Sequence, residues 1–242
     1  MQPPSLNLAT SSSLALLLSL LACLTCLTSQ ITQKAIASPT NSKVPAVLVF
    51  GDSIVDTGNN NYFPSVAKCN FPPYGRDFMG GIPTGRFSNG KVPSDLIVEG
   101  LGIKELLPPY LDPTLTLQDL LTGVNFASGG GGYDPLTSNL AEALSLRVQL
   151  KLFEEYLEKV KSGIGEERSK EIVSESLYVV CTGTNDISTT YFPTPFRKLH
   201  YDIASYTDLM LQFASTFIQG IILRKYLLNM REAGQKEIVE QS

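Results

Sequence analysis

The sequence has few of the residues on which several common kinds of functional site depend. Among its 242 residues there is no tryptophan and only one histidine, His200. One histidine and four cysteines do not make the clustered Cys/His set that a zinc site needs, so no metal centre is expected. Charged residues are only 17% of the chain, the net charge is −4, and no Lys/Arg-rich block occurs. The composition therefore gives no electrostatic case for nucleic-acid binding.

The first 37 residues are predicted to be a signal peptide, and the protein is expected to be secreted. Leu14 to Leu27 is an apolar run, and Ala35-Ile36-Ala37 is a small-x-small cleavage pattern. The alternative is a membrane anchor, but this run is shorter than the roughly 20 residues that a spanning helix needs. Residues 38–242 would then form the mature domain. No Asn-x-Ser/Thr sequon occurs, so N-glycosylation is not expected.

Two cysteines, Cys69 and Cys181, remain outside the predicted leader. A pair in a secreted protein can form a disulfide, but Cys181 ends an apolar strand and also suits a small buried core residue. The other pair, Cys23 and Cys26, lies in the leader, so its C-x-x-C spacing is not read as a redox motif.

One stretch near the start of the mature chain organises the rest. The unbroken apolar run Val44–Phe50 ends abruptly in Gly51-Asp52-Ser53, as expected for a buried strand of a parallel sheet. Ligands bind at the carboxyl ends of such strands. Ser53 therefore stands where a nucleophile would be placed, although a serine there also suits a plain turn. The Gly-x-Ser-x-Gly elbow is absent, since Val55 occupies its second glycine position.

Two further strands are predicted to end in loops of unusual composition. The segment Gly123–Tyr133 runs into four consecutive glycines, which let backbone N–H groups approach a ligand closely. A phosphate-binding loop is the rival interpretation, but Pro135 stands at the third glycine position of a Gly-x-Gly-x-x-Gly frame. The third strand, from Leu177, ends in Gly183-x-Asn185-Asp186. From composition alone these loops would be ordinary turns.

Together the three strand ends resemble three sequence blocks of the plant GDSL esterase/lipase family, within the SGNH hydrolases. Phe50-Gly-Asp-Ser-Ile-Val-Asp-Thr-Gly-Asn59 is similar to the first block, Asn125-Phe-Ala-Ser-Gly-Gly130 to the second, and Gly183-Thr-Asn-Asp186 to the third. The resemblance implies that Ser53 is the nucleophile, with the Gly129 N–H and the Asn185 amide as oxyanion-hole donors. It also implies a three-layer α/β/α flavodoxin-like fold, an acyl ester or lipid substrate, and no cofactor.

The sequence also departs from the family pattern. The Asp-x-x-His block that supplies the family's general base is missing, and Arg197 stands three residues before His200. Only about three of the family's five parallel strands are predicted, and the tail 220–242 stops resembling the family. We therefore expect a C-terminally truncated product, either a splice variant or an erroneous gene model, with weak or absent esterase activity. The alternative function is a non-catalytic, secreted acyl- or carbohydrate-binding isoform.

Four helices and one long loop region are expected between and after the strands. The helix in Val92–Gly102 would have Ser94 as its N-cap. Leu144–Val160 is amphipathic, Glu166–Ser174 is short and charged, and Tyr201–Leu228 reads as one long helix. Residues 62–91 are rich in Pro, Gly and Asn and predict ordered loops. With few strands, the sheet would keep an open edge, which favours association and marginal stability.

Overall fold

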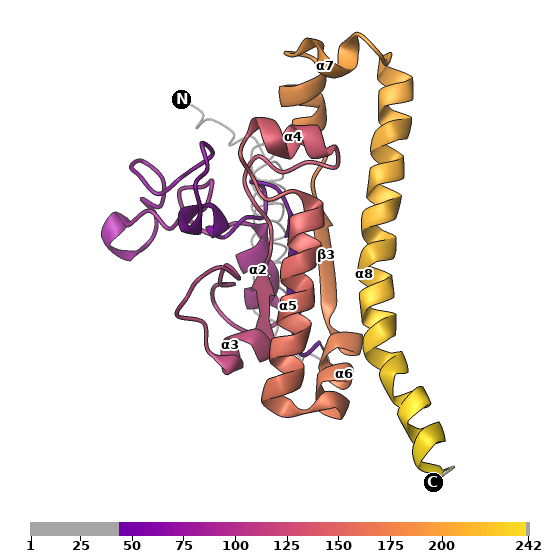
Figure 1. Cartoon of the computed structure of the whole chain (residues 1–242). Coiled ribbons are helices and arrows are strands. Elements are labelled where there is room, and N and C mark those ends of the chain that lie inside the picture. Colours follow the sequence, from indigo (N-terminus) through magenta and orange to yellow (C-terminus); the bar gives the residue numbers. More distant parts are fainter. Residues whose placement is uncertain (1–43, 241–242) are drawn as a thin grey trace, which may run out of the picture. The chain divides into compact units, whose positions relative to one another are not determined.

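The computed structural model describes residues 44–240, with side chains described as far as residue 228 (Figure 1). The predicted signal peptide, residues 1–37, lies outside the described residues. None of the helices in the described ranges is both long enough and apolar enough to cross a membrane.

A parallel sheet of three strands forms the centre of the described domain. The strands are β1 (Val47–Gly51), β2 (Gly123–Asn125) and β3 (Leu177–Cys181), in the order β2-β1-β3. Val47 lies opposite both Gly123 and Leu177, so all three strands start level. This order is the beginning of the flavodoxin-like order 2-1-3. The predicted α/β class and the three parallel strands are confirmed.

The apolar run of β1 is unbroken because helices cover both of its faces. Successive side chains of a strand point to opposite faces. Leu48 and Phe50 therefore face α5 (Leu146–Ile164) and α8 (Ile203–Glu240), and Phe50 stacks on Phe126 with ring centroids 4.9 Å apart. The five apolar positions predicted for the inner face of α5 are all buried: Leu146, Leu150, Phe153, Leu157 and Val160.

The opposite face of the sheet is covered by α2 (Pro93–Gly100), whose Val98 packs with Val47 and Val49. The predicted N-cap of this helix is wrong. Val92 is the N-cap, because Pro93, which has no N–H, takes the first helical position. Ser94 lies inside the helix, where its buried hydroxyl donates to the Val55 carbonyl at 2.6 Å.

Helix α8 is longer than predicted and starts two residues later. It runs unbroken through Gly220, although glycine is a weak helix former. Glycine fits this position because α8 packs closely on α5. A Cβ on Gly220 would lie 2.7 Å from the Leu150 side chain of α5. Phe217 of α8 reaches Phe50 of β1, with ring centroids 5.6 Å apart.

Shorter elements complete the described chain. The predicted loop region 62–91 is confirmed as ordered loops, and the charged segment after α5 is a helix, α6 (Glu166–Glu175). The remaining short elements are η1 (Asn59–Tyr62), η2 (Met79–Gly81), α3 (Leu117–Thr122), α4 (Pro135–Leu140), η3 (Asp186–Tyr191) and α7 (Pro195–Lys198).

The two cysteines of the described domain are free thiols rather than a disulfide. Cys69 is buried. Cys181 is only half-buried, because it ends β3 at the open edge of the sheet. The alternative that the two cysteines form a bridge is therefore wrong for this structure.

Replacing the N-cap of α3 is expected to cost about 1 kcal/mol of unfolding free energy. Thr116 Oγ1 accepts from the Asp119 N–H at 3.2 Å, and the Asp119 carboxylate accepts from the Thr116 N–H at 2.9 Å. Thr116→Ala removes the first of these bonds. Chemical denaturation of Thr116→Ala and Thr116→Ser measures the loss, and equal losses in the two variants would contradict the capping role.

Candidate active site

Ser53 lies in the turn that follows β1, at the carboxyl edge of the sheet. From β1 the chain passes first to β2 on one side and later to β3 on the other, so this turn is at the point where the strand order reverses. Such points are the usual ligand sites of open parallel sheets. Ser53 is half-buried, and among the described residues neither its Oγ nor its backbone N–H has a hydrogen-bond partner.

The turn carrying Ser53 is held in place by backbone and side-chain bonds. The Asp52 N–H donates to the Cys181 carbonyl at 3.1 Å, and the Asp52 carboxylate accepts from the Ile54 N–H at 3.0 Å. Gln149 of α5 accepts from the Gly51 N–H and donates to the Gly51 carbonyl, both at 2.9 Å. Gly51 has φ +142°, and a Cβ there would collide with the Cys181 carbonyl. The position before Asp52 therefore requires glycine.

Asp56 connects the serine turn to the glycine loop. Its carboxylate accepts from the N–H groups of Gly58 at 2.8 Å, Asn59 at 2.9 Å and Gly129 at 2.9 Å. Burial raises the pKa of Asp56 to about 6, although these three donors and the Arg86 charge favour its ionised form. The bonds of Asp52 and Asp56 give both carboxylates a structural role in the serine turn.

Gly129, the predicted oxyanion donor of the second loop, is buried beside this carboxylate. Its N–H is already bonded to Asp56. The next N–H, that of Gly130, meets no acceptor among the residues that the structure describes. A Cβ on Gly129 would lie 2.2 Å from the Phe87 ring, so the close packing here also requires glycine.

Asn185, the predicted donor of the third loop, follows β3 and is half-buried. Its Nδ2 donates to the Gly131 carbonyl at 2.8 Å, which uses one of its two amide hydrogens. The neighbouring Asp186 is fully buried and accepts from the N–H groups of Tyr133 at 2.9 Å and Asp134 at 2.8 Å. Asn185 is therefore fixed against the end of the glycine loop.

The three loops carrying Ser53, Gly129 and Asn185 are adjacent in the structure. The Ser128 N–H donates to the Gly51 carbonyl at 3.1 Å, which joins the first loop to the second. The Asp52 bond to Cys181 joins the first to the third, and the Asn185 bond to Gly131 joins the third to the second. The three strand-end loops therefore meet at the carboxyl edge of the sheet.

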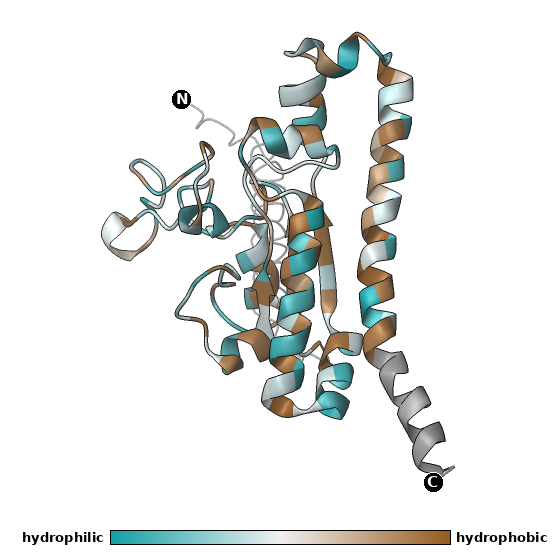
Figure 2. Ribbon diagram, in the orientation of Figure 1, coloured by the Kyte–Doolittle hydropathy of each residue, from teal (hydrophilic) through white to brown (hydrophobic). Residues whose placement is uncertain are grey.

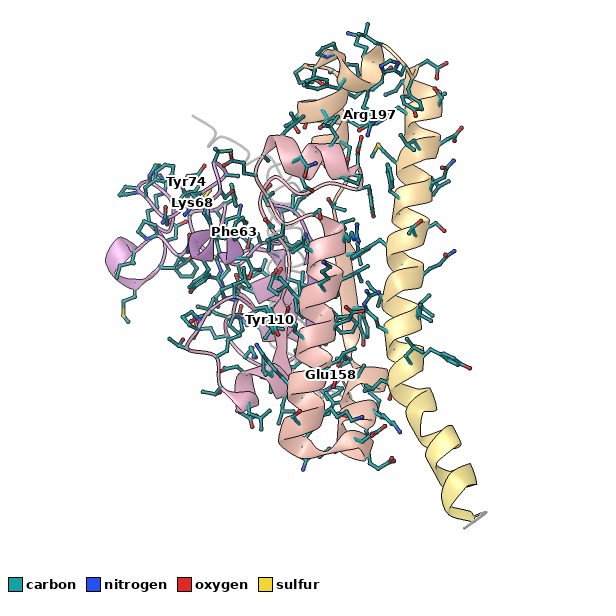
Figure 3. All side chains as sticks on the ribbon, in the orientation of Figure 1. Phe63, Lys68, Tyr74, Tyr110, Glu158 and Arg197 are labelled. Atoms are coloured by element: carbon teal, nitrogen blue, oxygen red, sulfur yellow. The ribbon has the colours of Figure 1, made fainter. Side chains whose placement is uncertain are left out.

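His200 lies in the exposed turn between α7 and α8. Arg197, three residues earlier and labelled in Figure 3, instead forms a two-bond ion pair with Asp134 at 2.6 and 2.8 Å. In the described part of the chain no hydrogen bond joins an imidazole to Ser53. A general base for the Ser53 hydroxyl is therefore not supplied by His200 in this structure.

The sequence reasoning missed several side chains that shape the site. Asn59 Nδ2 donates to the carbonyls of Asn125 and Ala127, both at 2.8 Å, and Asn60 Nδ2 donates to the Gly129 carbonyl at 2.9 Å. The sequence feature that could have indicated Asn59 and Asn60 is the run of asparagines at the end of the first motif. Gln149 was detectable as a polar residue on the buried face of an amphipathic helix.

Between about pH 4 and pH 6, the stability that Asp56 contributes is expected to fall as the pH rises. Asp56 keeps its proton in the folded state up to about pH 6, whereas the usual pKa of an aspartate is 3.8. The folded state therefore binds more protons than the unfolded state in this window, so the free energy of unfolding falls with increasing pH.

Urea unfolding of the parent and of Asp56→Asn across this pH window tests the expectation. Asparagine does not titrate, so the free energy of unfolding of the parent should fall relative to that of Asp56→Asn as the pH rises and Asp56 ionises. Parallel pH profiles would show that Asp56 titrates alike in the folded and unfolded states.

Comparison with known proteins agrees with the motifs and the geometry. The GDSL-like Lipase/Acylhydrolase family profile matches residues 47–227. Three Arabidopsis thaliana relatives are GDSL esterase/lipase At3g14820 (53% identical over 79% of this chain and 54% of its own), EXL3 (53% over 79% and 52%) and EXL2 (50% over 78% and 54%). The comparison with solved structures found no match.

The matched range begins at β1, includes all three site loops and extends a few residues beyond Gly220, where the resemblance was expected to end. The chain spans about half the length of the curated relatives it matches. A family profile that matches most of the chain establishes membership. This chain therefore belongs to the GDSL-like lipase/acylhydrolase family.

Proposed function

We propose that the site hydrolyses carboxylic esters, with Ser53 Oγ attacking the acyl carbonyl carbon. The observation that carries this proposal is the unpartnered Ser53 hydroxyl at the junction of three loops. Attack converts the ester carbonyl oxygen into an oxyanion, and then the alcohol leaves and water hydrolyses the acyl-enzyme. Substrates would be acyl esters or lipids, as the family description and the names of the relatives suggest.

The oxyanion would be held by donors from all three loops. The free N–H of Ser53 and the remaining amide hydrogen of Asn185 are available for this role. The Gly129 N–H becomes available only if it leaves Asp56 when substrate binds, whereas the Gly130 N–H is free already. In other enzymes, removing one such donor costs about 10²–10³ in kcat.

Slow turnover is part of the proposal, because a serine hydroxyl without an adjacent base is a poor nucleophile at neutral pH. The exposed position of His200 also favours the second candidate function, in which the chain binds an acyl or carbohydrate ligand without hydrolysing it. Under that alternative, a short-chain ester would bind to the protein and be recovered intact.

A sensitive p-nitrophenyl butyrate assay of the parent and of Ser53→Ala tests the proposed function. We expect a small rate in the parent that is lost in Ser53→Ala. The matched control is Ser174→Ala, because Ser174 lies on α6 and its exposed hydroxyl bonds the Glu171 carbonyl, outside the proposed chemistry. Equal rates in the parent and Ser53→Ala would leave ligand binding as the better function.

We also propose that the protein is secreted, on the evidence of the apolar run Leu14–Leu27 and the Ala35–Ala37 pattern. Expression in a plant cell line, followed by N-terminal sequencing of protein from the medium, tests this proposal. A mature N-terminus at Ser38 is expected. Retention in the membrane fraction with Met1 intact would support an anchor instead.

A further inference from the structure

Helix α8 has a second apolar face, on the side away from the core. Its inner residues Phe217 and Ile221 are buried against the sheet and α5. On the other side Leu211, Ile218 and Ile222 are exposed by 66%, 40% and 59% of their surface. No charged residue occurs between Asp208 and Arg224, and Figure 2 shows hydrophobic colour recurring along this helix. A helix that is apolar on two sides normally has two packing partners.

The residues of this face follow the spacing of a helix–helix seam. Asp208, Leu211, Ser215, Ile218, Ile222 and Lys225 are separated by alternating steps of three and four. That alternation places the side chains in one line along the helix, as at the contact positions of a coiled coil. The apolar middle of the line is bounded by an acidic residue at one end and a basic residue at the other. We call these six residues the α8 seam.

A groove lies beside the seam and completes the apolar surface. It has a volume of about 240 Å³ and is lined by Tyr178 and Val180 of β3 and by Ile218, Ile221, Ile222 and Lys225 of α8. In the described sheet β3 is an edge strand, paired on one side only with β1. Within the groove, Lys225 Nζ lies 5.3 Å from the centroid of the Tyr178 ring and also bonds the Ser174 carbonyl.

The seam of one copy is complementary to the seam of a second copy that runs in the opposite direction. If two copies lie antiparallel about a two-fold axis between Thr216 and Phe217, each residue before the axis faces the residue of the second copy that lies equally far after it. Asp208 then lies opposite Lys225 of the second copy, and Leu211 opposite its Ile222. The small Ser215 lies opposite Ile218. Each end pairs opposite charges and the middle pairs apolar side chains, which is what an isologous two-fold interface requires.

We propose that the α8 seam is a self-association surface, through which two copies of this chain form an antiparallel dimer. Leu211 of each copy enters the groove between α8 and β3 of the other, beside Ile218 and Ile222. The proposal is independent of ester hydrolysis, because Ser53 lies in the turn after β1 and is not one of the seam residues.

Light scattering coupled to size-exclusion chromatography of the purified full chain, over a dilution series, tests the proposal. The parent is expected to be a dimer that dissociates on dilution. Ile222→Glu is expected to weaken the dimer by at least about tenfold, because it places a charge in the buried seam. The matched control is Leu223→Glu, since Leu223 is 53% exposed but lies outside the seam. Circular dichroism verifies that both variants are folded.

A charge exchange provides a second, more specific test. Asp208→Lys is expected to weaken the dimer by several-fold through like-charge contact with Lys225 of the second copy. Combining it with Lys225→Asp is expected to recover most of the loss. The proposal is overturned if the parent is monomeric throughout, if Leu223→Glu disrupts association as much as Ile222→Glu, or if the exchanged pair shows no recovery.

Discussion

Ester hydrolysis by this chain is expected to be about 10⁶-fold slower in kcat than hydrolysis by a relative with a complete Ser-His-Asp triad. That figure is the cost of removing the triad histidine in a well-studied serine protease, where binding and the oxyanion hole still leave about 10³–10⁴ over water. The physical reason is that Ser53 must lose its proton as it attacks. The sole imidazole of the sequence is in the exposed turn before α8 and is not bonded to Ser53.

Parallel assays of this chain and of the Arabidopsis EXL3 relative, with the same short-chain ester, measure the difference. Two variants identify the side chains on which the residual rate of this chain depends. Ser53→Ala should remove it, whereas His200→Ala should leave it unchanged. A rate close to that of EXL3 that disappears in His200→Ala would show that the turn before α8 moves and delivers its imidazole to Ser53. That outcome would end the expectation of slow turnover.

Arg86→Met is expected to lower the free energy of unfolding by about 3–5 kcal/mol, the usual cost of breaking a buried ion pair from one side. Arg86 Nε and Nη2 donate to the Asp95 carboxylate, both at 2.8 Å, and its guanidinium also donates to the carbonyls of Thr57 and Leu107. The side chains of this pair are exposed by only 6% and 0%. Without Arg86 the negative charge of Asp95 would remain buried with only backbone donors.

Urea unfolding of four proteins separates this effect from a general loss of packing. The double variant Arg86→Met with Asp95→Leu should recover part of the loss, because no buried charge is left unpaired. Arg76→Met is the control for an exposed pair, since Arg76 and Asp77 expose 66% and 64% of their side chains. Its expected cost is about 0–1 kcal/mol. A cost of that size for Arg86→Met as well would mean that water reaches the Arg86–Asp95 pair.

Local patterns predicted the elements well where one dominant physical signal was present. The apolar run of β1 and the alternating faces of α5 are readable because burial on two faces or on one face sets the spacing of apolar residues. The N-cap of α2 was mispredicted because Pro93 and Ser94 compete for the start of the helix. A preference for serine at N-caps is weaker than the restriction of proline to the first turn.

The roles of individual donors in the site were harder to predict. A motif aligns Gly129 with an oxyanion donor, but hydrogen bonding to Asp56 occupies its N–H in this structure. Gln149, far from the motif in sequence, forms hydrogen bonds with both the N–H and the carbonyl of Gly51. Sequence spacing does not report which acceptor a given N–H meets, because that depends on how distant segments pack.

The amino-acid sequence by itself determined the class of the fold, the order of the three strand-end loops and the identity of the nucleophile candidate, Ser53. These follow from local hydrophobic patterns and from contiguous motifs, which do not depend on long-range contacts. Only the tertiary structure decided that the three loops touch, that Gly129 is bonded to Asp56 and that α8 keeps a second apolar face exposed. Each of these depends on which residues distant in the chain meet, and the periodicity of a single segment carries no information about its partner.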